Sequence, residues 1–76
     1  MEDKILTHIY KFKINHFSDI WWIGVSEDNN ISIGDNVVII KDNSDFKKGS
    51  YAKVIGIEER NLTTTEILQF NKIVKI

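Results

Sequence analysis

The chain has 76 residues, of which 42% are hydrophobic, and its ten basic and eleven acidic residues leave a formal net charge of -1. This length allows one domain and excludes a second, and the absence of cysteine excludes disulfides and thiolate zinc, so apolar packing must hold the fold together. The balanced charge excludes a global field that would attract a polyanion, although a local basic patch stays open.

We expect no targeting signal at the start of the chain. Only two apolar residues follow the acidic opening at residues 1–4, and no apolar run reaches the roughly 18 residues that a membrane helix needs. We therefore expect a cytoplasmic protein without a membrane partner. Residues 1–76 form one predicted domain, in which residues 1–6 are expected to be a loose N-terminal segment.

The first predicted element is a strand over residues 8–14. Aromatic or aliphatic side chains alternate there with two lysines, in the order Tyr10, Lys11, Phe12, Lys13 and Ile14. This period of two is typical of a half-buried strand. Lys11 and Lys13 then lie on the solvent face, where lysine also discourages edge-to-edge pairing.

A second strand is predicted over residues 20–25, where apolar residues follow one another without alternation. Neighbouring side chains of a strand point to opposite faces, so Trp21 and Trp22 cannot enter the same core. We assign Trp21, Ile23 and Val25 to the interior, because that set is the more uniformly apolar.

The outward face of this strand is the strongest site-like feature of the sequence. It presents Ile20 and Trp22, and contiguous exposed apolar surface usually marks an interface. The alternative is that a neighbouring loop, or the segment around Ile5 and Leu6, covers Trp22.

A glycine and an aspartate divide the next apolar stretch, over residues 31–40. We predict a short strand over residues 31–33, a bend at Gly34-Asp35 and a strand over residues 37–40. The second of these strands consists only of valine and isoleucine, which favours a central position in the sheet with both faces buried.

Polar residues dominate positions 41–50 and predict a loop, in which Phe46 either anchors the chain to the core or is presented to a partner. A further strand is predicted over residues 51–58. Gly56 within it predicts a bulge or a tight corner, and hence a curved, closed sheet rather than a flat one.

The end of the chain has two interpretations. Residues 62–65 are rich in strand formers, so we predict strands over residues 62–68 and 72–75. Thr63 to Glu66 also matches a helix capping box, which would give a single terminal helix instead. The elements together predict an all-β fold: a small antiparallel β-barrel of five to six strands, or such a barrel with a short C-terminal helix.

Residues with catalytic or metal-binding chemistry are sparse. His8 and His16 are the only histidines, and about 26 Å would separate them along one strand, too far to share a metal. His16, Ser18 and Asp19 supply the residue types of a nucleophilic triad, but triads are assembled from separate segments. We predict no enzyme activity, no cofactor and no metal site.

Three stretches of the chain occur in an order known from one protein family. They are residues 22–25, residues 31–39 with the pattern Ile-x-x-Gly-Asp-x-Val-x-Ile, and residues 52–58. In this order the chain resembles the second domain of translational GTPases such as elongation factor Tu, although Gly-Asp-x-Val also opens strands in SH3-like barrels. The resemblance implies a small β-barrel and, as a lesser implication, association with ribosomes or RNA. The family's glycines before the second strand are replaced by residues 15–19, so no functional residue is carried over.

The sequence predicts a non-catalytic binding or adaptor module, with a protein as the favoured partner. The predicted contact surface consists of Ile20, Trp22, Tyr10, Lys11 and Lys13. RNA is the lesser candidate, through aromatic and cationic side chains, namely Tyr10, Trp22, Lys11, Lys13, Lys47, Lys48 and Lys53. Two other classes stay open: a small inhibitor or immunity-type protein that blocks an enzyme, and a structural homo-oligomer that buries Ile20 and Trp22 against symmetry mates.

Overall fold

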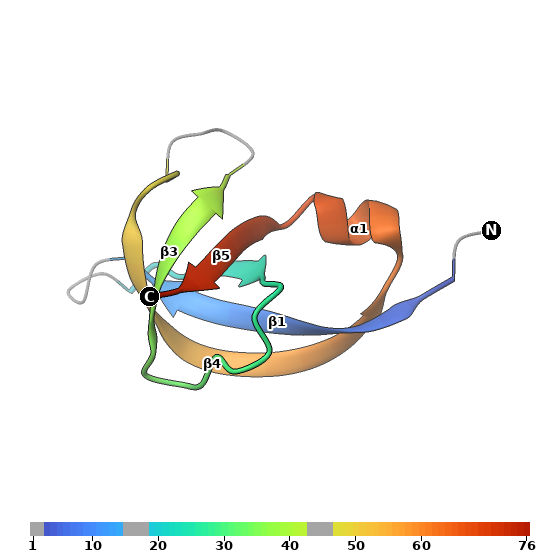
Figure 1. Cartoon of the computed structure of the whole chain (residues 1–76), viewed down its shortest axis with the longest axis horizontal. Helices are drawn as coiled ribbons and strands as arrows, with labels where there is room; N and C mark the ends of the chain where they lie inside the picture. Colours follow the sequence, from blue (N-terminus) through green and yellow to red (C-terminus); the bar gives the residue numbers. More distant parts are fainter. Residues whose placement is uncertain (1–2, 15–18, 43–46) are drawn as a thin grey trace.

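The computed structural model describes residues 3–14, 19–42 and 47–76, which form a closed β-barrel with one short helix (Figure 1). In chain order its elements are β1 (Ile5–Lys13), β2 (Trp22–Val25), β3 (Asn36–Lys41), β4 (Tyr51–Leu62), α1 (Thr64–Leu68) and β5 (Asn71–Lys75). Around the barrel the strands follow the order β1-β2-β5-β3-β4, and every pair is antiparallel except β2 with β5. The predicted all-β barrel is therefore confirmed.

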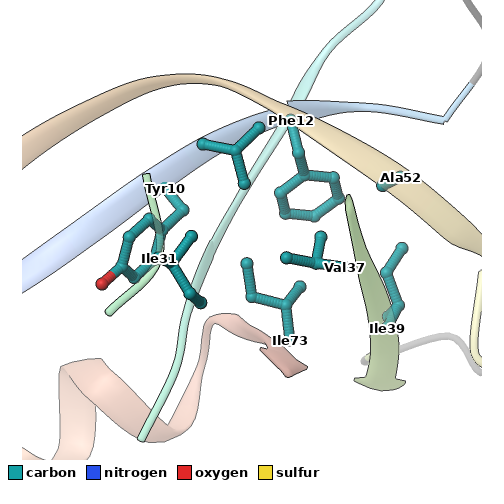
Figure 2. Close-up of a cluster of buried hydrophobic side chains, with 8 residues drawn as sticks. Tyr10, Phe12, Ile31, Val37, Ile39, Ala52 and Ile73 are labelled. Carbon is teal, nitrogen blue, oxygen red and sulfur yellow. The ribbon is translucent and has the colours of Figure 1, made fainter. Parts of the chain in front are cut away.

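Two clusters of buried side chains stabilise this fold. The larger one, the barrel core, fills the interior (Figure 2) and consists of Tyr10, Phe12, Ile31, Val37, Ile39, Ala52, Val54 and Ile73. The smaller one, the helix-side cluster, consists of Ile9, Val25 and Leu62 with the partly buried Ile23, Ile67 and Phe70. Ile9 and Tyr10 are neighbours on β1, so the two clusters lie on opposite faces of that strand.

The longest ladder joins β1 to β4. The nine residues from Ile5 to Lys13 all have partners on β4, and the first of them, Ile5, lies opposite Leu62. Ile5 and Leu6 therefore belong to the strand, and the prediction of a loose segment over residues 1–6 is wrong for these two. The reason is that β4 is longer than predicted and offers them a pairing partner.

A β-bulge interrupts this ladder near its middle. Lys11 lies opposite Gly56, but the next residue, Phe12, lies opposite Val54. Ile55 is thus an extra residue on β4, and the bulge predicted from Gly56 is confirmed. Figure 1 shows β4 curving along β1 over the long axis of the molecule.

The predicted bend at Gly34-Asp35 is also confirmed. Gly34 has a φ of 95°, and the Asp35 N–H donates to the Ser32 carbonyl oxygen at 3.0 Å. The Asp35 carboxylate accepts the Ser32 N–H at 2.8 Å, and the Gly34 N–H donates to the Val54 oxygen of β4 at 2.8 Å. The short strand predicted over residues 31–33 is wrong, because these residues lead into the turn and help to form it.

β3 buries only one of its faces, which corrects the prediction of a strand buried on both. Val37 and Ile39 point into the barrel core, whereas Val38 is half-buried and Ile40 is exposed. The reason is that a closed barrel has a single interior, which takes alternate residues of each strand. β3 does lie between two other strands, β4 and β5.

The predicted role of Phe46, in the loop after β3, lies outside the described residues.

α1 replaces the strand predicted over residues 62–68. The Thr63 hydroxyl accepts the Glu66 N–H at 3.2 Å, and the Glu66 carboxylate accepts the Thr63 N–H at 2.9 Å. This reciprocal capping box stabilises the first helical turn against the strand preference of the threonines. The helix is not terminal, because β5 follows it, and the strand predicted over residues 72–75 is confirmed.

Acid should weaken the fold through two carboxylates. Backbone N–H donors lower the pKa of both, since Ser32 donates to Asp35 and Thr63 donates to Glu66. In the unfolded chain each carboxylate has its ordinary pKa of about 4, and in the folded protein its pKa is lower. The carboxylate therefore stabilises the fold fully at pH values above the ordinary pKa, and this stabilisation is lost as the pH falls through the folded pKa. Urea unfolding at falling pH should show the loss, and Asp35→Asn, which keeps an acceptor but cannot titrate, should flatten it. An equal acid dependence in variant and wild type would contradict the role of Asp35.

Gly24 should tolerate no side chain, because β2 and β5 approach closely there. A Cβ at Gly24 would lie 2.8 Å from the backbone oxygen of Asn71 and 3.1 Å from Cε1 of Phe12. We expect Gly24→Ala to lower the free energy of unfolding by about 2 kcal/mol, as overpacking does. Gly56→Ala is the matched control, since its Cβ would meet nothing closer than 3.7 Å. Equal losses in chemical denaturation would contradict the clash.

Candidate functional site

Tyr10, which was predicted on the contact surface, is a core residue. Its side chain is only 2% exposed and belongs to the barrel core, so that prediction is wrong. The cause is the inward direction of alternate β1 residues. The Tyr10 hydroxyl lies 3.5 Å from the backbone oxygen of Asp28, and burial together with the Asp28 carboxylate raises the pKa of Tyr10. Tyr10 therefore connects β1 to the segment between β2 and β3.

The two tryptophans have positions opposite to those predicted. Trp22 is half-buried and packs against the barrel core, whereas Trp21 is 49% exposed. The reason is that β2 is covered on both faces, since Ile23 and Val25 join the helix-side cluster. The Lys47 ammonium lies 4.9 Å from the centroid of the Trp22 ring, so a neighbouring loop also covers this side chain.

The other predicted contact residues do lie on or near the outer surface. Ile20 is exposed, and Lys11 and Lys13 are partly exposed. The Lys11 ammonium lies 4.2 Å from the centroid of the Trp21 ring, at a cation–π distance. The structure thus brings Lys11 together with Trp21, and not with the tryptophan that the sequence pattern favoured.

One edge of β1 is open. β2 pairs with β1 only at residues 10–12, whereas β4 pairs along the whole strand. On the β2 side, no strand in the described part of the chain pairs with residues 5–9. The chain leaves the line of β2 at Ser26, whose hydroxyl accepts the N–H of Asp28 at 3.1 Å. We call residues 5–9 the open edge.

A groove of about 520 Å³ runs beside the open edge. β1 borders it with the consecutive residues 5–8, and consecutive residues indicate the edge of a strand rather than one face. The opposite walls come from residues 26–29 after β2, from Ile67 and Leu68 of α1, and from Phe70. Figure 1 shows α1 lying beside this end of β1.

The charged groups of the groove have partners within the protein or balance one another. The Lys72 ammonium donates to the Glu27 carboxylate at 2.8 Å, and the Lys41 ammonium donates to the backbone oxygen of Leu68 at 2.7 Å. These two lysines balance Glu27 and Asp28, which also line the groove. The groove therefore suits an uncharged ligand with apolar groups better than an ion.

The described residues hold no cluster of three His, Cys, Asp or Glu side chains that could bind a metal ion. His8 forms a cross-strand pair, with Nε2 at 3.0 Å from the Glu59 carboxylate. His16 and Ser18 lie outside the described residues. Within residues 3–14, 19–42 and 47–76, no helix is long and apolar enough to cross a membrane.

The groove is the feature that the sequence interpretation missed. Residues 5–9 read Ile-Leu-Thr-His-Ile, an uncharged run of strand-forming types that continues the predicted first strand toward the N-terminus. This run is the signal that could have extended that strand. The open edge itself has no local signal, because it depends on β2 having four residues where β1 has nine.

Comparison of the chain with models of protein families, with curated protein sequences and with solved structures finds no match. The resemblance to the second domain of translational GTPases therefore stays a prediction from the sequence. The class that the structure defines is a small five-stranded closed β-barrel with a groove beside an open strand edge.

Substitution of each tryptophan should separate their roles. Trp22→Ala should lower the free energy of unfolding by about 2 to 3 kcal/mol, because it leaves a cavity beside the barrel core. Trp21→Ala is the matched control and should cost less than about 1 kcal/mol, because Trp21 belongs to neither cluster. Chemical denaturation measures both losses. A larger loss of stability in Trp21→Ala than in Trp22→Ala would show that Trp22 is the surface residue.

Proposed function

We propose that this chain is a non-catalytic protein-binding module, which takes an extended segment of its partner as an added strand. The observation that carries the proposal is the open edge, where residues 5–9 pair with β4 on one side and residues 5–8 border a largely apolar groove on the other. In strand addition, main-chain hydrogen bonds supply affinity, and pockets for alternate side chains supply specificity.

The open edge lacks the devices that usually prevent strand pairing. Edge strands are commonly protected by lysine, proline, bulges or short length. Residues 5–9 contain no Lys, Asp, Glu or Pro, and the bulge of the ladder lies further along, at Ile55. Lys11 lies where β2 already pairs with β1, and Lys13 is the last residue of β1, away from the open edge. An unprotected edge supports an extended peptide as the occupant.

The bound segment would continue the line of β2. β2 runs antiparallel to β1 and ends at Val25, where the protein's own chain departs. Five residues opposite the open edge would span about 17 Å. Their alternate side chains would face Ile67 and Leu68 on one side and residues 26–29 on the other. Because the charges of this groove are balanced, apolar and uncharged side chains fit it best.

A charge at the open edge should weaken peptide binding without unfolding the protein. Leu6 lines the groove and is 61% exposed, so Leu6→Lys should keep the melting temperature and weaken binding about tenfold or more. The ligands are peptides selected from a random display library on the wild-type protein, with affinities measured by calorimetry. Ile33→Lys is the matched control, because Ile33 is 66% exposed and does not line the groove.

Hydrogen exchange locates the bound peptide. Amides of the open edge that face the groove should gain protection in the complex. Protection confined to other segments, or equal loss of affinity in Leu6→Lys and Ile33→Lys, would show that the proposal is wrong. A wild-type dimer in sedimentation that Leu6→Lys dissociates would show that a second copy of the chain occupies the edge, and not a partner protein.

A further inference from the structure

A second surface lies on the outer face of the barrel at the far end of β1. Lys13 lies directly opposite Lys53 in the β1–β4 ladder. Like charges in directly opposed positions destabilise a sheet. Neither lysine forms an ion pair with any residue that the structure describes. These two ammonium groups therefore have no salt-bridge partner in the described part of the protein.

The two lysines line a hollow together with an aromatic side chain. The hollow has a volume of about 320 Å³, and its lining includes Lys13, Lys53, Tyr51, Asn36 and Ile76. No Asp or Glu side chain of the described residues lines it. The Tyr51 side chain is 69% exposed, so its ring is open to a ligand. The hollow thus combines two cations, an available aromatic ring and an amide.

The same face continues toward β2. Alternate residues of a strand share a face, so Lys11 lies on the face of Lys13, about 7 Å further along β1. The Lys11 ammonium lies over the half-exposed ring of Trp21. Two exposed aromatic rings, those of Trp21 and Tyr51, therefore flank three lysines on the outside of the barrel.

We propose that this face binds a single-stranded nucleic acid, with a backbone phosphate between Lys13 and Lys53 and an unpaired base stacked on Tyr51. Lys11 and Trp21 contact the next nucleotides of the bound nucleic acid. The phosphate supplies the counter-charge that the opposed lysines lack, and the stacking requires bases that are free of a duplex. An acidic peptide would satisfy the lysines but would leave the exposed rings without a partner. The surface is separate from the groove beside the open edge, so this inference does not rest on peptide binding.

The test is fluorescence anisotropy with a labelled oligouridylate of about ten nucleotides, titrated at about 50 mM salt and upward. Lys13→Gln and Lys53→Gln should each weaken binding several-fold, and each should reduce the slope of log affinity against log salt by about 0.7. Tyr51→Ala should weaken binding about tenfold, whereas Tyr51→Phe should retain it, because phenylalanine still stacks.

Lys4→Gln is the matched control, because Lys4 is exposed just before the opposite end of β1. It should leave affinity and salt slope nearly unchanged, as should Leu6→Lys in the groove.

The proposal is overturned if the wild type does not bind the oligouridylate, or if Lys4→Gln weakens binding as much as Lys13→Gln. It is also overturned if Tyr51→Ala binds normally, or if an acidic peptide binds as tightly. Thermal unfolding of every variant shows whether a loss reflects misfolding, and Tyr51→Phe keeps the test valid if Tyr51→Ala unfolds.

Discussion

The ladder between β1 and β4 is the constraint on which the rest of the structure depends. It runs over nine residues of β1, whereas β2 covers only three of them. Within the barrel the ladder directs Phe12 and Val54 into the core, and the bulge at Ile55 lets it curve there. Toward the other end of the ladder, Ile9 and Leu62 point away from the barrel core. There Ile67 of α1 packs against them and shields them from solvent. The helix therefore shields one face of β1 but does not pair with its edge.

Much of the barrel can be predicted from the sequence, because most of its elements have a local signal. The alternation of Tyr10 and Phe12 with lysines and the glycine within β4 both specify features that the structure has. The face of β2 cannot be predicted in this way. Strand geometry requires Trp21 and Trp22 to point apart, but the sheet has apolar cover on both sides of β2, so hydrophobicity alone does not select the inner residue.

The helix and the candidate site show the same division between local and non-local causes. Residues 62–65 have competing local signals, strand propensity against a capping box, and the capped turn is favoured where Ile67 can pack on the helix-side cluster. The groove has no local signal at all, because it arises from the difference in length between β1 and β2. A difference between paired strands becomes visible only when the pairing is known.

The placement of lysines on β1 separates the two candidate surfaces by their physical basis. If these lysines served only to prevent edge pairing, they would be expected on residues 5–9, where the edge is open. They lie instead at position 11, where β2 pairs with β1, and at position 13, the last residue of β1. There the opposition of Lys13 to Lys53 is unfavourable for the sheet, so folding alone does not account for it. An uncharged edge suits main-chain pairing, whereas uncompensated cations beside exposed rings suit an anionic ligand that stacks. One long strand can therefore present two surfaces of different chemistry, one along its edge and one on its outer face.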